Sequence, residues 1–127
     1  MDMRYDIANR LKHQFHCDYY CGPDRSSFIY THGGDITFLL TPVSRDAPIL
    51  QIQVMNPSAD RESLIFVNDV FVGTLAVAAL DKSGGFADFL VPEQARHSSE
   101  SWTIRISPSA DPKKLGWDII KAKLYTN

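Results

Sequence analysis

Several familiar signs of function are missing from this chain of 127 residues. It has only two cysteines, too few for the disulfide framework of a small secreted scaffold. No apolar run approaches the length of a membrane span, and the N-terminal stretch MDMRYDIANR is too polar for a secretory signal. We therefore expect a cytoplasmic protein without a membrane span.

Concentrated charge and catalytic motifs are also missing. The formal net charge is -2, the isoelectric point is near 6.0, and no basic run exceeds the pair Lys113–Lys114, so we expect no nucleic-acid partner. The sequence contains no nucleophile elbow, phosphate-binding loop, dinucleotide-binding fingerprint or zinc-protease motif. We therefore expect a protein that is not an enzyme and uses no cofactor.

What the chain does contain, from residue 28 onward, is short apolar runs separated by Gly, Pro, Asn, Asp or Ser. The runs are rich in β-branched and aromatic residues, as strands are. Some alternate: in ILQIQVM (49–55) the apolar residues would face a core while Gln51 and Gln53 face water. The pattern predicts a mainly β protein, an antiparallel β-sandwich or jelly roll of about eight strands. The runs are FIYT (28–31), ITFLL (36–40), ILQIQVM (49–55), SLIFV (63–67), VFVGTLAV (70–77), FADFLV (86–91), SWTIRIS (101–107) and WDIIKAKLY (117–125).

Two local signals refine this organisation. Near the N-terminus, Ile7, Leu11 and Phe15 fall on one face at helical spacing, which predicts a short helix. We therefore expect an N-terminal helical segment over residues 1–18, followed by a β-sandwich over 19–127. The dipeptide Asn68-Asp69 predicts a two-residue hairpin turn, because both residue types tolerate positive φ.

Half of the four histidines and both cysteines fall in HQFHCDYYCGPDR (13–25). Four such donors suit a closed zinc site, but the spacing lacks the usual paired knuckles and two of the donors are adjacent. A thiol nucleophile would need a positioned base and a third group to orient that base, and no third member is identifiable. We expect no metal here and two small buried cysteines where the helix meets the sandwich. The residues concerned are His13, His16, Cys17 and Cys21.

The order of segments resembles a known class of domain. VNDVFVGTL (67–75), GGFADFLVP (84–92), SWTIRIS (101–107) and SPSADPKKLGWDIIKAKL (107–124) follow YYCGPDRSSFIYTHGGDITFLL (19–40). This order is similar to that of galactose-binding-like β-sandwich domains, above all the accessory domains found beside bacterial glycosyltransferases and in carbohydrate-binding modules. Asn-Asp stands where those domains usually have Asn-Gly in the hairpin. The resemblance implies a lectin-like fold that hosts sugar binding, other ligand binding or purely architectural roles.

A sugar site needs an exposed aromatic ring for the apolar C–H faces of the sugar and polar groups for its hydroxyls. Trp117 shares strand parity with Lys121 and Lys123, so it is predicted to be a stacking surface where the loop 108–116 emerges. Alternatively, Trp117 packs beneath that loop as a plug. The residues expected to bind ligand at this end of the sandwich are Trp117, Asp111, Lys113, Arg96 and His97.

These observations favour a non-catalytic carbohydrate-binding or glycan-associated module that binds sugar weakly. The alternative is a structural or assembly domain without a small-molecule ligand, which contacts a second copy or a glycan-synthesis partner. SLIFV (63–67) and VFVGTLAVAAL (70–80) are apolar at both strand parities. We therefore expect either the N-terminal helix or a second chain to cover them.

Overall fold

The structure is a computed structural model that describes residues 16–17, 29–30, 34–42 and 48–126. Within these residues it contains nine strands, two of them only two residues long, and two short 3₁₀ helices. The strands are β1 (His16–Cys17), β2 (Ile29–Tyr30), β3 (Ile36–Leu40), β4 (Pro48–Met55), β5 (Glu62–Val67), β6 (Val70–Ala76), β7 (Phe86–Leu90), β8 (Trp102–Pro108) and β9 (Asp118–Thr126). The helices are η1 (Val77–Ala79) and η2 (Glu93–Ala95).

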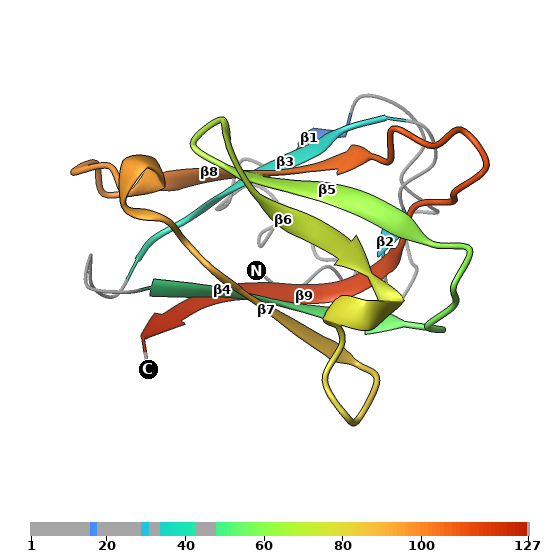
Figure 1. The fold of residues 1–127 in the computed structure, drawn as a ribbon. Helices are drawn as coiled ribbons and strands as arrows, with labels where there is room; N and C mark the ends of the chain where they lie inside the picture. The colour runs from blue at the N-terminus through green and yellow to red at the C-terminus, as the bar shows by residue number, and fades with distance from the viewer. Residues whose placement is uncertain (1–15, 18–28, 31–33, 43–47, 127) are drawn as a thin grey trace.

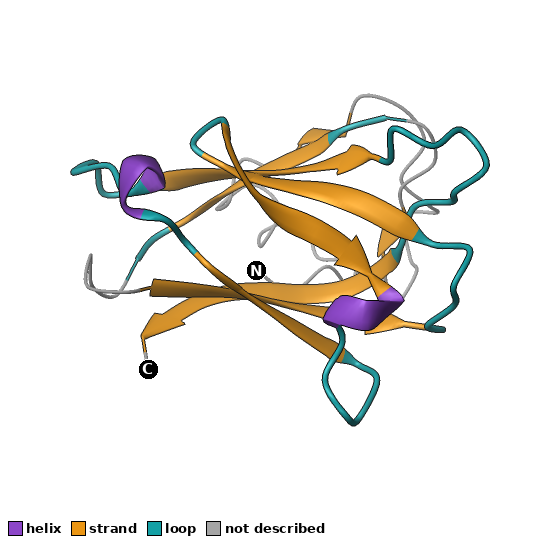
Figure 2. Ribbon diagram, viewed as in Figure 1, coloured by secondary structure: helices purple, strands orange, loops and turns teal. Residues whose placement is uncertain are grey.

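The strands form two antiparallel sheets that lie one above the other (Figures 1 and 2). One sheet has the order β1-β3-β8-β5-β6, and the other has the order β2-β9-β4-β7. Both sheets join strands that are far apart in the sequence, such as β4 and β9. The prediction of a mainly β protein built as an antiparallel sandwich is confirmed.

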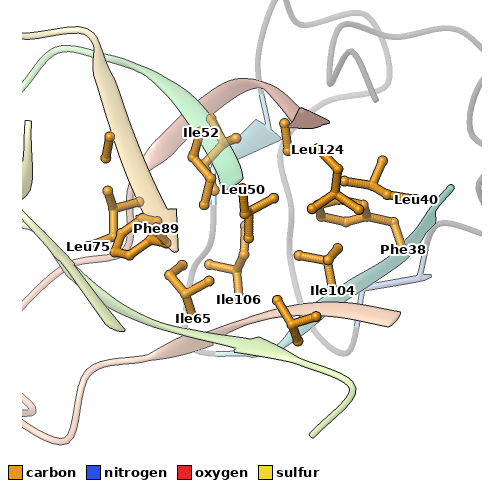
Figure 3. Close-up of a cluster of buried hydrophobic side chains, with 14 of the residues drawn as sticks. Phe38, Leu40, Leu50, Ile52, Ile65, Leu75, Phe89, Ile104, Ile106 and Leu124 are labelled. Atoms are coloured by element: carbon orange, nitrogen blue, oxygen red, sulfur yellow. The ribbon is translucent and has the colours of Figure 1, made fainter. Parts of the chain in front are cut away.

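Among the described residues, one hydrophobic core lies between the sheets and takes side chains from both layers (Figure 3). Burial alternates along β4 as the sequence predicts, with Gln51 and Gln53 on the side away from the core. It also alternates along β8, where Trp102 and the two following isoleucines are fully buried. Each of these two strands therefore has one face that packs in the core and one face that points to the outer side of its sheet.

The hairpin between β5 and β6 turns as predicted. Asn68 and Asp69 have φ values of 50° and 65°, and Val67 pairs with Val70 across the turn. Asn68 also ties this turn to β8, because its Oδ1 accepts a hydrogen bond from the backbone N–H of Thr103 at 3.0 Å. The turn is therefore anchored to the neighbouring strand and not only to its own hairpin.

The predicted N-terminal helix lies outside the described residues, as do His13 and Cys21. His16 and Cys17, near the end of the segment 1–18, form β1, which pairs with Thr37 and Ile36 of β3. No helix in the described part of the chain is long and apolar enough to cross a bilayer.

Candidate functional site

Trp117, the predicted stacking surface, lies inside the core. Its side chain is 0% exposed, and its indole Nε1 donates a hydrogen bond of 2.6 Å to the backbone carbonyl of Leu75. A ring buried in this way presents no face to a sugar. The prediction that Trp117 is an exposed platform is therefore wrong, and the alternative that it packs beneath its loop is the arrangement observed.

A β-bulge explains why the parity argument failed. Gln53 of β4 pairs with Lys121 of β9, but Val54 pairs with Ile119, so Ile120 is an extra residue on β9. An extra residue reverses which face each later side chain occupies. Ile119 is consequently buried while Lys121, two residues later, is exposed.

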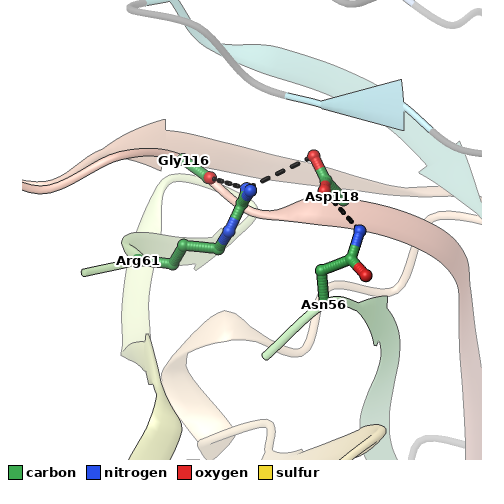
Figure 4. Close-up of polar contacts among 4 residues, drawn as sticks. All are labelled: Asn56, Arg61, Gly116 and Asp118. Atoms are coloured by element: carbon green, nitrogen blue, oxygen red, sulfur yellow. Dashed lines mark hydrogen bonds and ion pairs between the residues drawn. The ribbon is translucent and has the colours of Figure 1, made fainter. Parts of the chain in front are cut away.

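Polar contacts hold the backbone on both sides of Trp117 (Figure 4). Arg61 donates a hydrogen bond of 2.7 Å to the carbonyl of Gly116 and lies 3.3 Å from a carboxylate oxygen of Asp118. The other carboxylate oxygen of Asp118 accepts a hydrogen bond of 3.3 Å from the side-chain amide of Asn56. Gly116 and Asp118, the two neighbours of Trp117, are thus held by Arg61 and Asn56 from other segments, so these contacts stabilise the start of β9.

Asp111 and Lys113 lie in the exposed loop between β8 and β9. The carboxylate of Asp111 accepts a hydrogen bond of 2.9 Å from the backbone N–H of Lys113, and the backbone N–H of Asp111 donates one of 3.0 Å to Ser109 Oγ. These contacts shape the loop and leave both side chains accessible to solvent. The role of Asp111 and Lys113 in binding stays a prediction.

Arg96 and His97 precede β8, whereas the loop with Asp111 follows it. The two ends of β8 lie at opposite ends of the sandwich (Figure 1). A strand of this length separates the two loops by roughly 20 Å. Arg96 Nε donates a hydrogen bond of 2.9 Å to the carbonyl of Val91. His97 is exposed, and its carbonyl accepts a hydrogen bond of 3.0 Å from Trp102 Nε1. The expectation that these residues share one end of the sandwich is therefore wrong.

A different concentration of polar and aromatic side chains covers the outer side of the four-stranded sheet. Here β4 lies between β7 and β9, and alternate side chains of the three strands point away from the core. The pairing arranges nine of these residues in three rows across the strands. We call these nine residues the sheet face. The rows are Leu90–Ile49–Tyr125, Asp88–Gln51–Lys123 and Phe86–Gln53–Lys121.

Asp88 links the three strands across the sheet face. One carboxylate oxygen accepts a hydrogen bond of 2.8 Å from the hydroxyl of Tyr125, and the other accepts one of 3.1 Å from the amide of Gln51. The bond to Asp88, with partial desolvation and the negative charge of that carboxylate, raises the pKa of Tyr125. The ammonium group of Lys123 lies 5.4 Å from the centre of the Tyr125 ring. These contacts hold polar side chains of β4, β7 and β9 in place without a ligand.

A cavity of about 190 Å³ opens on the sheet face, lined by Gln51, Gln53, Phe86, Lys121 and Lys123. Phe86 supplies an apolar wall, and the two glutamines supply amide donors and acceptors. The amide of Gln53 forms no hydrogen bond with another described residue, so it is available to a ligand. The cavity is smaller than the roughly 300–1,000 Å³ of a typical small-molecule pocket, which fits a ligand that is only partly enclosed.

The outer side of the five-stranded sheet has a different character. Phe66 and Phe71 meet edge to face with ring centres 5.7 Å apart, and the guanidinium of Arg105 lies 4.2 Å from the centre of the Phe66 ring. Asp69 lies 3.5 Å from Arg105, and Phe71 is 51% exposed. On this surface the aromatic ring of Phe66 is covered by the guanidinium of Arg105, whereas on the sheet face Phe86 lines a cavity together with polar side chains.

Sequence patterns carried part of the signal for the sheet face. The alternation in ILQIQVM places Gln51 and Gln53 outside, and the lysines near the C-terminus form a polar row of the same kind. The sequence does not indicate that β4 and β9 are neighbours, because their pairing joins segments about 70 residues apart. Phe86 and Asp88 come to the same surface only through the pairing of β4 with β7.

Two solved structures share this fold. A family 35 carbohydrate-binding module from Clostridium thermocellum superposes with a TM-score of 0.59 at 16% identity, over 89% of this chain and 88% of that chain. A family GH115 4-O-methyl-α-glucuronidase with specificity for decorated arabinogalactans superposes with a TM-score of 0.58 at 11% identity, over 89% of this chain but 16% of the enzyme. No protein-family model and no curated protein matches the sequence. These likenesses establish a fold like that of a carbohydrate-binding module.

Proposed function

We propose that this chain is a non-catalytic carbohydrate-binding module whose ligand lies on the sheet face. The cavity lined by Phe86, Gln53 and Lys121 is the observation that carries the proposal. An aromatic wall matches the C–H face of a sugar ring, and amide and ammonium groups match its hydroxyls. The fold shared with a family 35 carbohydrate-binding module supports this assignment.

The affinity should be weak. A cavity of about 190 Å³ encloses little of a saccharide, and the rest of the ligand would lie over open sheet. We expect a Kd in the millimolar to micromolar range, equivalent to roughly 4–8 kcal/mol of binding free energy. A weak module is useful beside a catalytic domain, because tethering the two raises the effective concentration of substrate. The match to a small part of a larger glucuronidase supports such an accessory role.

The test combines a glycan array with titration calorimetry. Once the array identifies a binding oligosaccharide, wild type is compared with the double variant Gln53→Ala/Phe86→Ala. Loss of one aromatic contact and one hydrogen bond should cost about 2 kcal/mol, or roughly thirtyfold in Kd.

Phe71→Ala is the matched control, because it removes a partly exposed phenylalanine from the opposite sheet and should leave Kd unchanged. The variant Asp111→Ala/Lys113→Ala tests the loop between β8 and β9 as a competing site. The proposal fails if no glycan binds, or if the loop variant loses affinity while the sheet-face variant keeps it.

A second candidate function is assembly of two copies through the five-stranded sheet. It is favoured by the half-exposed Phe71, which lies on β6 at the edge of that sheet and packs against Phe66. An edge strand with an exposed aromatic ring is a surface on which a second copy can pair. Light scattering should then give a concentration-dependent molar mass that Phe71→Ser returns to that of the monomer. A monomer at all concentrations would eliminate this function.

A further inference from the structure

We infer that the glycan bound on the sheet face is acidic, with carboxylate or sulfate groups held by Lys121 and Lys123. This inference rests on the proposed function, since it concerns the chemistry of the ligand at the same site. It identifies a class of saccharide and the two side chains that select it.

The two lysines are placed to act together. They alternate along β9 on either side of the buried Ala122, so they project to the same side of the sheet, about 7 Å apart along the strand. Both are exposed and both line the cavity. A saccharide in contact with Phe86 would therefore lie within reach of two ammonium groups.

No described carboxylate neutralises these ammonium groups. Neither Lys121 nor Lys123 forms an ion pair within the described part of the chain. Asp88 is the one carboxylate among the nine sheet-face residues, and both of its oxygens already accept hydrogen bonds from Tyr125 and Gln51. The sheet face thus carries a net charge of +1 from two lysines and one aspartate, on a chain with a net charge of -2. A local excess of positive charge on an acidic protein attracts anions to that site.

Lysines have another common role, which is to prevent strand edges from pairing with other chains. On its side away from β4, β9 pairs with β2 only at Asp118 and Ile119, so Lys121 and Lys123 have no described neighbour there. Edge protection would make the pair important for solubility but irrelevant to the charge of a ligand. If the lysines bind the ligand, affinity depends on the charge of the saccharide. If they only protect the strand edge, affinity does not depend on that charge.

The experiment uses saccharides that differ only in charge. The pairs are oligogalacturonate with its methyl ester, glucuronic acid-bearing xylo-oligosaccharide with the undecorated chain, and sulfated galacto-oligosaccharide with its desulfated form. Calorimetry compares the wild type, Lys121→Gln/Lys123→Gln, and the control Lys82→Glu, which makes the net charge more negative by the same amount at an exposed lysine outside the sheet face.

We expect at least one acidic saccharide to bind more tightly than its neutral partner, by roughly two- to fivefold for each lysine engaged. The preference should disappear in Lys121→Gln/Lys123→Gln, persist in the control, and weaken as salt is raised. Preference within the galacturonate or xylo-oligosaccharide pair identifies a carboxylate ligand, and preference within the galacto-oligosaccharide pair identifies a sulfate ligand.

Three results would overturn the inference. Equal binding of acidic and neutral partners, abolished by Gln53→Ala/Phe86→Ala, would leave the proposed function intact and refute the acidic ligand. An acid preference that survives in Lys121→Gln/Lys123→Gln would place the anion elsewhere. Binding of no acidic saccharide would also refute it, and the glycan array then decides separately whether the sheet face binds neutral sugars.

Discussion

The variant Trp117→Phe tests whether Trp117 is a core residue or a binding residue. The variant removes the indole N–H that donates to the carbonyl of Leu75 at 2.6 Å, in surroundings where the side chain is 0% exposed. Leaving a buried carbonyl without its partner costs about 1–3 kcal/mol. The smaller ring also leaves part of its space empty, at a cost of about 1–2 kcal/mol. We therefore expect the free energy of unfolding to fall by about 2–5 kcal/mol, a large part of the ~5–15 kcal/mol typical of a domain.

Urea unfolding followed by circular dichroism measures this change without relying on tryptophan emission. Glycan affinity is measured in parallel on folded protein, and it should equal that of the wild type. In Trp102→Phe, Trp117 is the remaining tryptophan, and its emission should be blue-shifted and resistant to quenching by acrylamide. Full stability of Trp117→Phe together with weakened glycan binding would refute the buried placement and restore Trp117 as a stacking surface.

Two further predictions concern the packing of the sandwich and the sheet face. A Cβ at Gly73 would lie 2.6 Å from a ring carbon of Phe89, so Gly73→Ala should lower the free energy of unfolding by about 1–3 kcal/mol, as measured by urea unfolding. Gly85→Ala is the control and should leave stability unchanged, because the nearest atom to its added Cβ would be 3.9 Å away. Equal stabilities of the two variants would contradict the close approach of β6 and β7. The hydroxyl of Tyr125 donates to Asp88, which raises the pKa of the phenol, so Asp88→Ala should move the titration of Tyr125 to lower pH. NMR of ring carbons would show this, and an unmoved titration would mean that the hydrogen bond is absent in solution.

The parts of the fold that could be predicted from sequence are those specified locally. The alternation along β4 identifies its buried face, since the pleat of a strand fixes which side chains share a side. The turn at Asn68 and Asp69 could be predicted because positive φ at both positions suits these residue types. Such features depend on residues within a few positions of one another.

The parts that could not be predicted depend on one irregularity and on long-range pairing. The bulge at Ile120 leaves no mark in the sequence, yet it reverses the parity on which the exposure of Trp117 was predicted. The sheet face combines three strands whose order in the sheet is set by the whole topology. The expectation that Arg96 lies beside the loop 108–116 failed for a different reason, because the predicted strand 101–107 runs between the two loops and separates them whatever its direction.

The proposed function requires glycan to bind on the outer side of the four-stranded sheet. Mapping of amide chemical-shift changes by NMR during titration with a binding oligosaccharide tests it most directly. We predict that the largest changes fall on β4, β7 and β9, at and beside Gln51, Gln53, Phe86, Lys121 and Lys123. Changes confined to the loop 108–116 or to the loop with Arg96 and His97, with the sheet face unmoved, would contradict the proposed function.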